Sequence, residues 1–256
     1  MFIRKCAAQL YTVRDALKED YNLVLRRLKE QGWHAVQVSG THGYTAQQIG
    51  SFLRENQLQT AGMHVSLSEL TDDMAGVVAQ ARIFNTRDIV VPYLPQEYQN
   101  ALGYQMFKSH MNALAKKLSA VGYRLSYHNH AFEFATTIND MDALAYLLHP
   151  TPDNALLAEI DVYWVKKGGQ DPLTYIKTYA NRMPIIHLKD MADDAEQSFA
   201  EVGTGTIDFL PILRWGEANG VEWYAVEQDT CPRNPLDCLN TSLEHLRGYA
   251  AQMNAK

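Results

Sequence analysis

The stretch Tyr127-His128-Asn129-His130-Ala131-Phe132-Glu133-Phe134 directly follows a run with the pattern of a β-strand, residues 123–126. A strand that only packs in a core would continue its apolar alternation and then end in a turn of Gly, Asn or Asp. Here the alternation stops at two imidazoles, an amide and a carboxylate, which can bind a metal or exchange protons. The stretch therefore predicts one wall of a metal-centred site at a strand end, and we expect three later strands to supply the other walls.

Short apolar runs alternate with amphipathic segments along the chain, which is the pattern of repeated βα units around a parallel sheet. Eight strands are predicted, with approximate ranges 3–10, 35–38, 59–65, 88–91, 123–126, 155–161, 184–189 and 223–227. Eight strands and eight helices in strict alternation over 256 residues indicate an α/β fold, the (β/α)8 TIM barrel. No linker, low-complexity segment or repeat divides the sequence, so we expect residues 1–256 to form a single domain.

The predicted helices begin at recognisable capping signals. Thr45, with Gln48 three residues later, has the spacing of a capping box. Either Asn139 or Asp140 is expected to cap the helix that follows the opening stretch. The other predicted helices cover about 15–31, 68–83 and 98–121, begin near 172, and extend over 235–251.

The composition is that of a globular protein with an acidic balance. Hydrophobic residues make up 46% of the chain, charged residues make up 20%, and the formal net charge is -6. Because phosphate backbones are bound largely by Lys and Arg, this charge argues against nucleic acid as a partner. The first residues lack the pattern of a signal peptide, and no apolar run of about 18 residues could span a membrane, so we expect a cytoplasmic protein without a membrane partner. The three cysteines are expected to be free thiols.

Four potential metal ligands stand at the ends of four consecutive predicted strands: Glu133, Asp161, His187 and Glu227. Active sites of (β/α)8 barrels lie at the carboxyl ends of the strands, and consecutive strands are neighbours, so these side chains should converge. Each alone would more often be a helix cap or a salt-bridge partner, but Asp161 and His187 each follow an Ile in a buried strand, where an unpaired charge is costly. Three carboxylates and one imidazole suit one divalent metal ion, Mn²⁺ first, with Mg²⁺, Co²⁺ or Zn²⁺ as alternatives.

Several sequence segments around these predicted ligands resemble the sugar phosphate isomerase/epimerase family of xylose isomerase-like TIM barrels. They are residues 128–134, 160–164, 186–190, 202–208 and 226–229. The resemblance covers the second half of the chain closely and the first half by architecture. It implies a divalent metal held by Glu133, Asp161, His187 and Glu227, with Glu133 and Glu227 as the proton-transfer groups.

The implied chemistry moves a proton next to a carbonyl. A metal that binds a hydroxy-carbonyl unit of a sugar acidifies the C–H between the two oxygens, and two carboxylates can remove and return the proton. Glu133 and Glu227 on opposite faces would epimerise the carbon, whereas one group moving a proton between neighbouring carbons would interconvert an aldose and a ketose. The expected function is thus a metal-dependent sugar isomerase/epimerase with a small-molecule sugar as its partner.

Four further residues are expected to contact the substrate: His64, His130, Trp164 and Lys189. Core packing or a surface salt bridge is the competing interpretation for these residues. The glycine-rich turn at 203–205 lies where many barrels bind phosphate, but its neighbours are acidic. We therefore expect a non-phosphorylated sugar, keto-sugar or inositol derivative.

Other functions compete with the isomerase/epimerase interpretation. Loss of water from a keto-sugar such as a 3-keto-glycoside could use the same residues, so a metal-dependent lyase or hydratase is the main alternative. A non-catalytic sugar-binding barrel would not need two glutamates at a metal. A zinc-dependent endonuclease of the same superfamily would need a histidine where Trp164 stands. The assembly state is open, with a homodimer as the working expectation.

Overall fold

The computed structural model describes residues 2–255, which form one closed barrel of parallel strands. Around the barrel the strand order is β1-β12-β9-β8-β5-β4-β3-β2, which follows the chain once two small hairpins are set aside. The barrel strands are β1 (Cys6–Gln9), β2 (Ala35–Ser39), β3 (Gln59–His64), β4 (Asp88–Val91), β5 (Arg124–His128), β8 (Leu157–Asp161), β9 (Ile185–Leu188) and β12 (Trp223–Val226). The hairpins are β6 (Thr137–Ile138) with β7 (Met141–Asp142), and β10 (Asp190–Met191) with β11 (Phe199–Ala200). The predicted (β/α)8 barrel is confirmed.

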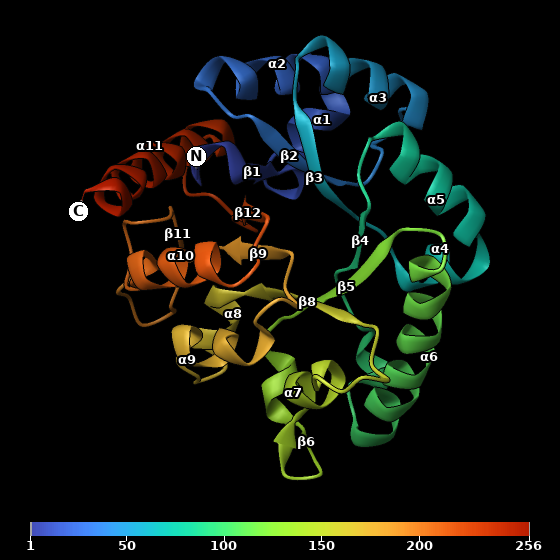
Figure 1. The fold of residues 1–256 in the computed structure, drawn as a ribbon. Helices are drawn as coiled ribbons and strands as arrows, with labels where there is room; N and C mark the ends of the chain where they lie inside the picture. The colour runs from blue at the N-terminus through green and yellow to red at the C-terminus, as the bar shows by residue number, and fades with distance from the viewer. Residues whose placement is uncertain (1, 256) are drawn as a thin grey trace.

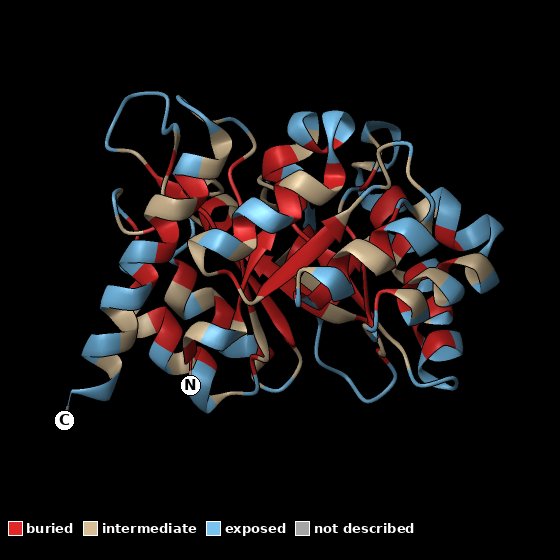
Figure 2. Cartoon of the chain, turned by 90° about the horizontal axis from the view of Figure 1, so that it is seen from above, coloured by how far each residue is buried: buried red, intermediate tan, exposed pale blue. Residues whose placement is uncertain are grey.

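Helices form a ring outside the barrel (Figure 1). They are α1 (Arg14–Glu19), α2 (Tyr21–Gln31), α3 (Ala46–Glu55), α4 (Leu67–Asp72), α5 (Met74–Ile83), α6 (Ala101–Ser119), α7 (Ala143–Leu148), α8 (Val162–Lys167), α9 (Pro172–Ile176), α10 (Phe209–Ala218) and α11 (Pro235–Asn254). In Figure 2 the barrel strands are buried, whereas the helices carry both buried and exposed residues. The core therefore lies inside the barrel and between the barrel and the helices.

The helix α2 illustrates how this outer layer attaches. Its buried residues Tyr21, Val24, Leu25 and Leu28 recur at the spacing that puts side chains on one face of a helix. Fully burying an apolar side chain contributes roughly 1.5–3 kcal/mol, so this face holds the helix against the strands. The helix ends at Gly32, whose φ of 101° is in the left-handed region that glycine adopts most readily.

Two segments predicted as continuous helices are each broken by an aspartate. Asp20 separates α1 from α2 and accepts a hydrogen bond from Leu23 N at 2.9 Å. Asp73 separates α4 from α5 and accepts one from Gly76 N at 2.9 Å. An aspartate side chain binds nearby backbone N–H groups, which favours a new helix start over a helix interior.

The two predicted capping signals have different outcomes. The capping box of Thr45 and Gln48 is confirmed, because each side chain accepts a hydrogen bond from the other residue's backbone N–H. The predicted cap at Asn139 or Asp140 is wrong. Both residues have positive φ, 50° and 62°, and they form the turn between β6 and β7. Asp142, at the end of that hairpin, caps α7 instead.

The strand β5 is longer than its sequence pattern indicates. The apolar alternation predicts an end near residue 126, whereas pairing continues through Tyr127 with β4 and through His128 with β8. His128 therefore stands at the carboxyl end of a barrel strand, where barrel sites are built.

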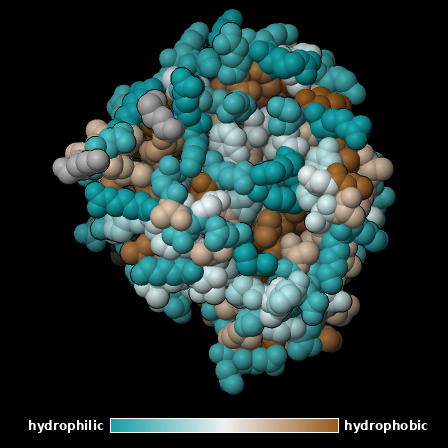
Figure 3. Space-filling view, viewed as in Figure 1, coloured by the Kyte–Doolittle hydropathy of each residue, from teal (hydrophilic) through white to brown (hydrophobic). Residues whose placement is uncertain are grey.

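The surface is largely hydrophilic on the face shown in Figure 3, with small apolar areas between polar side chains. Within residues 2–255, the helices are too short or too polar to cross a membrane. The three cysteines are free thiols, as expected.

Candidate metal centre

Four buried side chains converge at the carboxyl ends of neighbouring strands. His128 ends β5, Asp161 ends β8, His187 lies in β9, and Glu227 directly follows β12. One donor atom from each of them lies within 4.8 Å of a donor atom of each of the others. Two imidazoles and two carboxylates at one point form a candidate metal centre.

Strand register explains why these side chains meet. Asp161 and His187 are direct partners in the β8–β9 pair, so their side chains leave the sheet on the same side. His187 also pairs with the residue two places before Glu227, and His128 pairs with Glu159, two places before Asp161. Residues two apart in a strand face the same side, so all four ligand positions point into the barrel.

Three atoms of these four side chains are buried without a hydrogen-bond partner among the described residues: His128 Nδ1, Asp161 Oδ2 and His187 Nδ1. The other oxygen of Asp161, Oδ1, is engaged, because it accepts a hydrogen bond from Tyr163 N at 2.9 Å and so caps α8. Leaving a buried polar atom unsatisfied costs roughly 1–3 kcal/mol. Lys189 Nζ, 3.1 Å from Asp161 Oδ2, offsets part of that cost, and a cation bound beside Asp161 Oδ2 and His187 Nδ1 would offset more, so the donor set fits a metal ion.

The charge at the centre also fits a divalent cation. The fully buried Lys189 has its Nζ 3.1 Å from Asp161 Oδ2, 2.8 Å from Glu227 Oε2 and 2.5 Å from Asp229 Oδ2. Burial opposes the ammonium form, yet these carboxylates raise the pKa of Lys189 well above its usual value. Three carboxyl groups surround one ammonium, so acidic groups are in excess beside Lys189 and a further cation would be attracted there.

Glu133, the fourth ligand predicted from the sequence, lies outside this group. Its Oε1 accepts a hydrogen bond from Tyr127 OH at 2.7 Å, and its Oε2 accepts one from His130 N at 2.9 Å. Burial, the largest effect, raises the pKa of Glu133 to about 8 despite these two bonds. The structure thus brings together three of the four predicted ligands and puts His128, from the extended end of β5, in the place expected for Glu133.

The four predicted substrate contacts lie close to this centre. His64 ends β3, and its ring stacks on the ring of His187 with centroids 5.4 Å apart. The rings of His130 and Trp164 are 5.3 Å apart, and within the described chain each ring has a buried nitrogen that lacks a hydrogen-bond partner. Lys189 Nζ lies 5.3 Å from the Trp164 ring centroid. Their roles in substrate binding stay predictions.

Sequence reasoning missed three residues of this region: His128, Glu159 and Asp229. His128 was hidden by the early end predicted for β5. Glu159 carried a usable signal, because a glutamate two residues before Asp161 in an apolar strand must also face the barrel interior. Asp229 carried no such signal in the sequence, since it lies in a loop after β12.

A cavity of about 240 Å³ opens onto the centre. It is lined by Tyr11, Ser39, Pro92, Tyr93, His64, His128, His130, Glu227 and Asp229. This volume lies slightly below the about 300–1,000 Å³ usual for ligand pockets, so the cavity can hold only a small molecule. Candidate metal ligands and further imidazole and carboxylate groups thus face the same small space.

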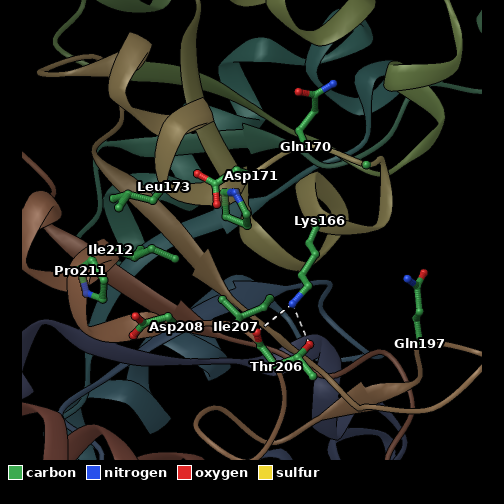
Figure 4. A pocket seen from close by; sticks show the side chains of 12 residues that line it. Lys166, Gln170, Asp171, Leu173, Gln197, Thr206, Ile207, Asp208, Pro211 and Ile212 are labelled. Atoms are coloured by element: carbon green, nitrogen blue, oxygen red, sulfur yellow. Dashed lines mark hydrogen bonds between the residues drawn. The ribbon is translucent and has the colours of Figure 1, made fainter.

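A wider hollow of about 570 Å³ lies by α8, α9 and the start of α10 (Figure 4). There Lys166 Nζ donates hydrogen bonds to Thr206 O at 2.8 Å and to Thr206 Oγ1 at 2.7 Å. Its walls include no member of the metal-centre group. We therefore place the chemistry in the smaller cavity.

Comparison with a curated protein relates this chain to a dehydratase. The inosose dehydratase of Clostridium beijerinckii (strain ATCC 51743 / NCIMB 8052) is 27% identical over 169 residues, which are 59% of this chain and 56% of that protein. The chain thus matches about half the length of this curated relative.

Solved structures share the whole barrel. A sugar phosphate isomerase/epimerase from Parabacteroides distasonis ATCC 8503 has a TM-score of 0.80 at 20% identity, covering 95% of this chain and 98% of that chain. A probable 3-DHS dehydratase involved in petrobactin synthesis from Bacillus anthracis has a TM-score of 0.71 at 14% identity, with coverages of 95% and 98%. At these identities the likeness shows the fold alone. The profile of the family described as xylose isomerase-like TIM barrel matches residues 25–249, and the chain belongs to that family.

Proposed function

We propose that this protein is a metal-dependent dehydratase, a lyase that removes water from a keto-substituted ring polyol such as a keto-inositol or keto-sugar. One observation carries the proposal. The candidate metal ligands His128 and Glu227 face the same small cavity as His130 and Asp229, which can bind or exchange protons. The name of the curated relative, inosose dehydratase, supports a lyase over the isomerase/epimerase expected first, so the alternative drawn from the sequence becomes the main proposal.

The metal would be held by His128, Asp161, His187 and Glu227. Bound there, a divalent cation would polarise the substrate carbonyl and acidify the neighbouring C–H. Two imidazoles beside two carboxylates suit Mn²⁺, Co²⁺ or Zn²⁺ better than Mg²⁺, which prefers oxygen ligands.

The chain's own residues would carry the protons. Elimination of water needs a base for the C–H beside the carbonyl and an acid for the departing hydroxyl. Glu227 is ionised and so able to accept a proton: burial favours its neutral form, but Lys189 and His187 hold its pKa well below its usual value. Asp229 suits the acid, because burial raises its pKa. The C–H electrons form the C=C bond, the C–O bond breaks, and the hydroxyl leaves as water.

Lys189 could restore both groups after each turnover. Its Nζ contacts Glu227 Oε2 at 2.8 Å and Asp229 Oδ2 at 2.5 Å, so it bridges the proposed base and the proposed acid. The ammonium can give a proton to Asp229 as it takes one from Glu227, so the two transfers are concerted and Lys189 stays charged throughout. This transfer needs no water inside the buried site.

The hydrogen bonds within the glycine-rich turn favour a substrate without phosphate. Gly203 N and Gly205 N both donate to Asp190 Oδ2 at 2.9 Å, and Ile207 N donates to Asp190 Oδ1 at 3.1 Å. These are the backbone N–H groups that a phosphate would need at this position. Because a carboxylate of the chain already accepts them, a neutral polyol is the better candidate.

The test is to incubate Mn²⁺-loaded protein with a keto-inositol and candidate keto-sugars in D₂O. We expect ultraviolet absorbance of a conjugated enone to rise as water is lost. Glu227→Gln should lower kcat by about 10²–10⁴-fold, the usual contribution of a general base. Asp88→Asn, which changes a buried carboxylate bound to Arg124 outside the cavity, is the matched control and should keep the activity.

Two results would refute a dehydratase. Deuterium appearing in an isomeric sugar without loss of water would establish the isomerase/epimerase instead. Tight sugar binding with neither exchange nor elimination would indicate a non-catalytic sugar-binding barrel.

A further inference from the structure

A network of buried polar side chains lies inside the barrel against the metal centre. Its members are Gln9 of β1, Gln37 of β2, Glu159 of β8, and the histidines His64 and His187. Gln9, Gln37, Glu159 and His187 are each 0% exposed. Buried polar groups of this kind are costly unless their hydrogen bonds are satisfied, so the direction of each bond carries information.

The amide of Gln9 has a fixed orientation. Its Oε1 accepts a hydrogen bond from the backbone N–H of Tyr11 at 3.1 Å, and a backbone N–H can only donate. Its Nε2 therefore points away from that bond and donates to Gln37 Oε1 at 2.6 Å. The hydrogen bond from Gln9 thus shows which end of the Gln37 amide is the oxygen.

The contact of Gln37 with Glu159 indicates the same orientation of the Gln37 amide. Gln37 Nε2 donates to Glu159 Oε2 at 2.6 Å, and a carboxylate can only accept. Two independent partners, Gln9 and Glu159, therefore agree on which end of the Gln37 amide is nitrogen and which is oxygen. Gln37 Oε1 is an acceptor wherever else it makes contact.

That oxygen contacts His187. His187 Nε2 lies 2.7 Å from Gln37 Oε1 and 2.9 Å from Glu159 Oε1. Both neighbours are acceptors, so the proton must reside on Nε2 for either contact to be favourable. The other ring nitrogen, Nδ1, lies 3.3 Å from Glu227 Oε2, so it is the nitrogen on the side of the other candidate ligands, where a cation would take the place of any proton it carries.

We propose that Glu159 and Gln37 are positioning residues for the metal centre, which hold His187 with its proton on Nε2 and present Nδ1 as the lone pair for the cation. This inference rests on the proposed metal centre and deepens it. A metal-bound histidine commonly donates its second ring N–H to a carboxylate or carbonyl, which fixes the ring and strengthens the ligand. Here a carboxylate and an amide oxygen share that role.

The alternative is that Glu159 itself binds a second ion. His64, His128, Glu159 and His187 also offer donor atoms within 4.8 Å of one another. However, Glu159 Oε1 is 2.7 Å from His64 Nε2 and 2.9 Å from His187 Nε2, and its Oε2 accepts from Gln37. These contacts are hydrogen bonds that already use the carboxylate, which favours the positioning role.

Glu159→Gln is the decisive variant, because it keeps the size of the side chain and removes one acceptor. A glutamine at 159 must place its NH₂ group either against Gln37 Nε2 or against the histidine N–H groups, so one donor meets another. Asp88→Asn is the matched control. Asp88 is a buried carboxylate at the start of β4, bound to Arg124 Nε at 2.6 Å and not part of either donor group.

The first readout needs no metal. Long-range ¹H–¹⁵N spectra of metal-free protein labelled in its nine histidines report which ring nitrogen of each carries hydrogen. We expect a protonated Nε2 at His187 in the wild type and in Asp88→Asn, and a changed protonation pattern at His187 in Glu159→Gln. A bare Nε2 in the wild type, or an unchanged His187 in Glu159→Gln, would overturn the proposal.

The second readout is Mn²⁺ affinity by isothermal titration calorimetry. Glu159→Gln should weaken binding by about 10–100-fold, as loss of a supporting group at a metal site does, while Asp88→Asn should bind like the wild type and Glu159→Asp should recover part of the loss. Unchanged affinity in Glu159→Gln would overturn the proposal, and so would a wild type that binds two ions of which this variant loses one. A wild type that binds no metal would end the proposed function, while the spectra would still decide whether Glu159 and Gln37 orient His187.

Discussion

Replacing Glu133 by glutamine should flatten the pH dependence of stability. Glu133 is fully buried, and burial raises its pKa from the ordinary 4.5 to about 8. Between these values the folded state keeps a proton that the unfolded chain has released, so the free energy of unfolding of the wild type falls as pH rises through this window. A pKa change of this size corresponds to on the order of 5 kcal/mol in total. Glutamine does not titrate, so the variant should lack this contribution.

Urea unfolding of metal-free wild type and Glu133→Gln across this pH window measures the effect. The wild type should lose up to about 1.4 kcal/mol per pH unit more than the variant, because one pKa unit equals that free energy. Parallel curves for the two proteins would refute the assignment of a raised pKa to Glu133. Mn²⁺ titration of the same variant is a second check. A loss of no more than the about 10–100-fold typical of supporting residues is expected, and a larger loss would return Glu133 to the set of candidate ligands.

Three further predictions concern the centre and its surroundings. His128→Ala and Asp161→Ala should each weaken Mn²⁺ binding by more than the about 10–100-fold typical of supporting residues, and calorimetry showing full affinity in either would exclude that residue as a ligand. Lys189→Met should abolish turnover in the enone assay while circular dichroism shows a folded chain, because base and acid lose their bridge; retained activity would argue against the relay. Asp190→Asn should cost about 1.5–3 kcal/mol in urea unfolding and speed proteolysis near residues 203–207, since hydrogen bonds to a charged group are lost; unchanged stability would contradict this.

The barrel and three of its candidate metal ligands could be predicted because they depend on local patterns. Strand alternation and helix periodicity repeat along the chain, and Asp161, His187 and Glu227 each stand where an apolar strand ends. The parallel register of neighbouring strands then brings these residues together, because all strand ends lie at one rim of the barrel. No knowledge of distant contacts was needed for these residues.

The candidate ligand from β5, His128, could not be predicted in the same way. Alternation of apolar residues marks where a strand stops facing an apolar core, whereas backbone pairing can continue past that point. Tyr127 and His128 pair with the neighbouring strands although their side chains break the pattern expected for packing. The pattern of hydrophobic residues therefore does not reveal a strand end inside a polar site. The residue chosen from the sequence, Glu133, comes after His128, the last residue of β5.

The position of Glu133 still connects it to the centre. Its two oxygens accept hydrogen bonds from Tyr127 OH and from His130 N, residues on either side of His128. One buried carboxyl thus ties together the last part of β5 and the segment that leaves it. Because His128 belongs to the metal group and His130 lines the cavity, any movement of this segment would displace a ligand and a substrate-facing ring together. Glu133 thus holds the backbone on both sides of His128 from a position outside the candidate metal centre.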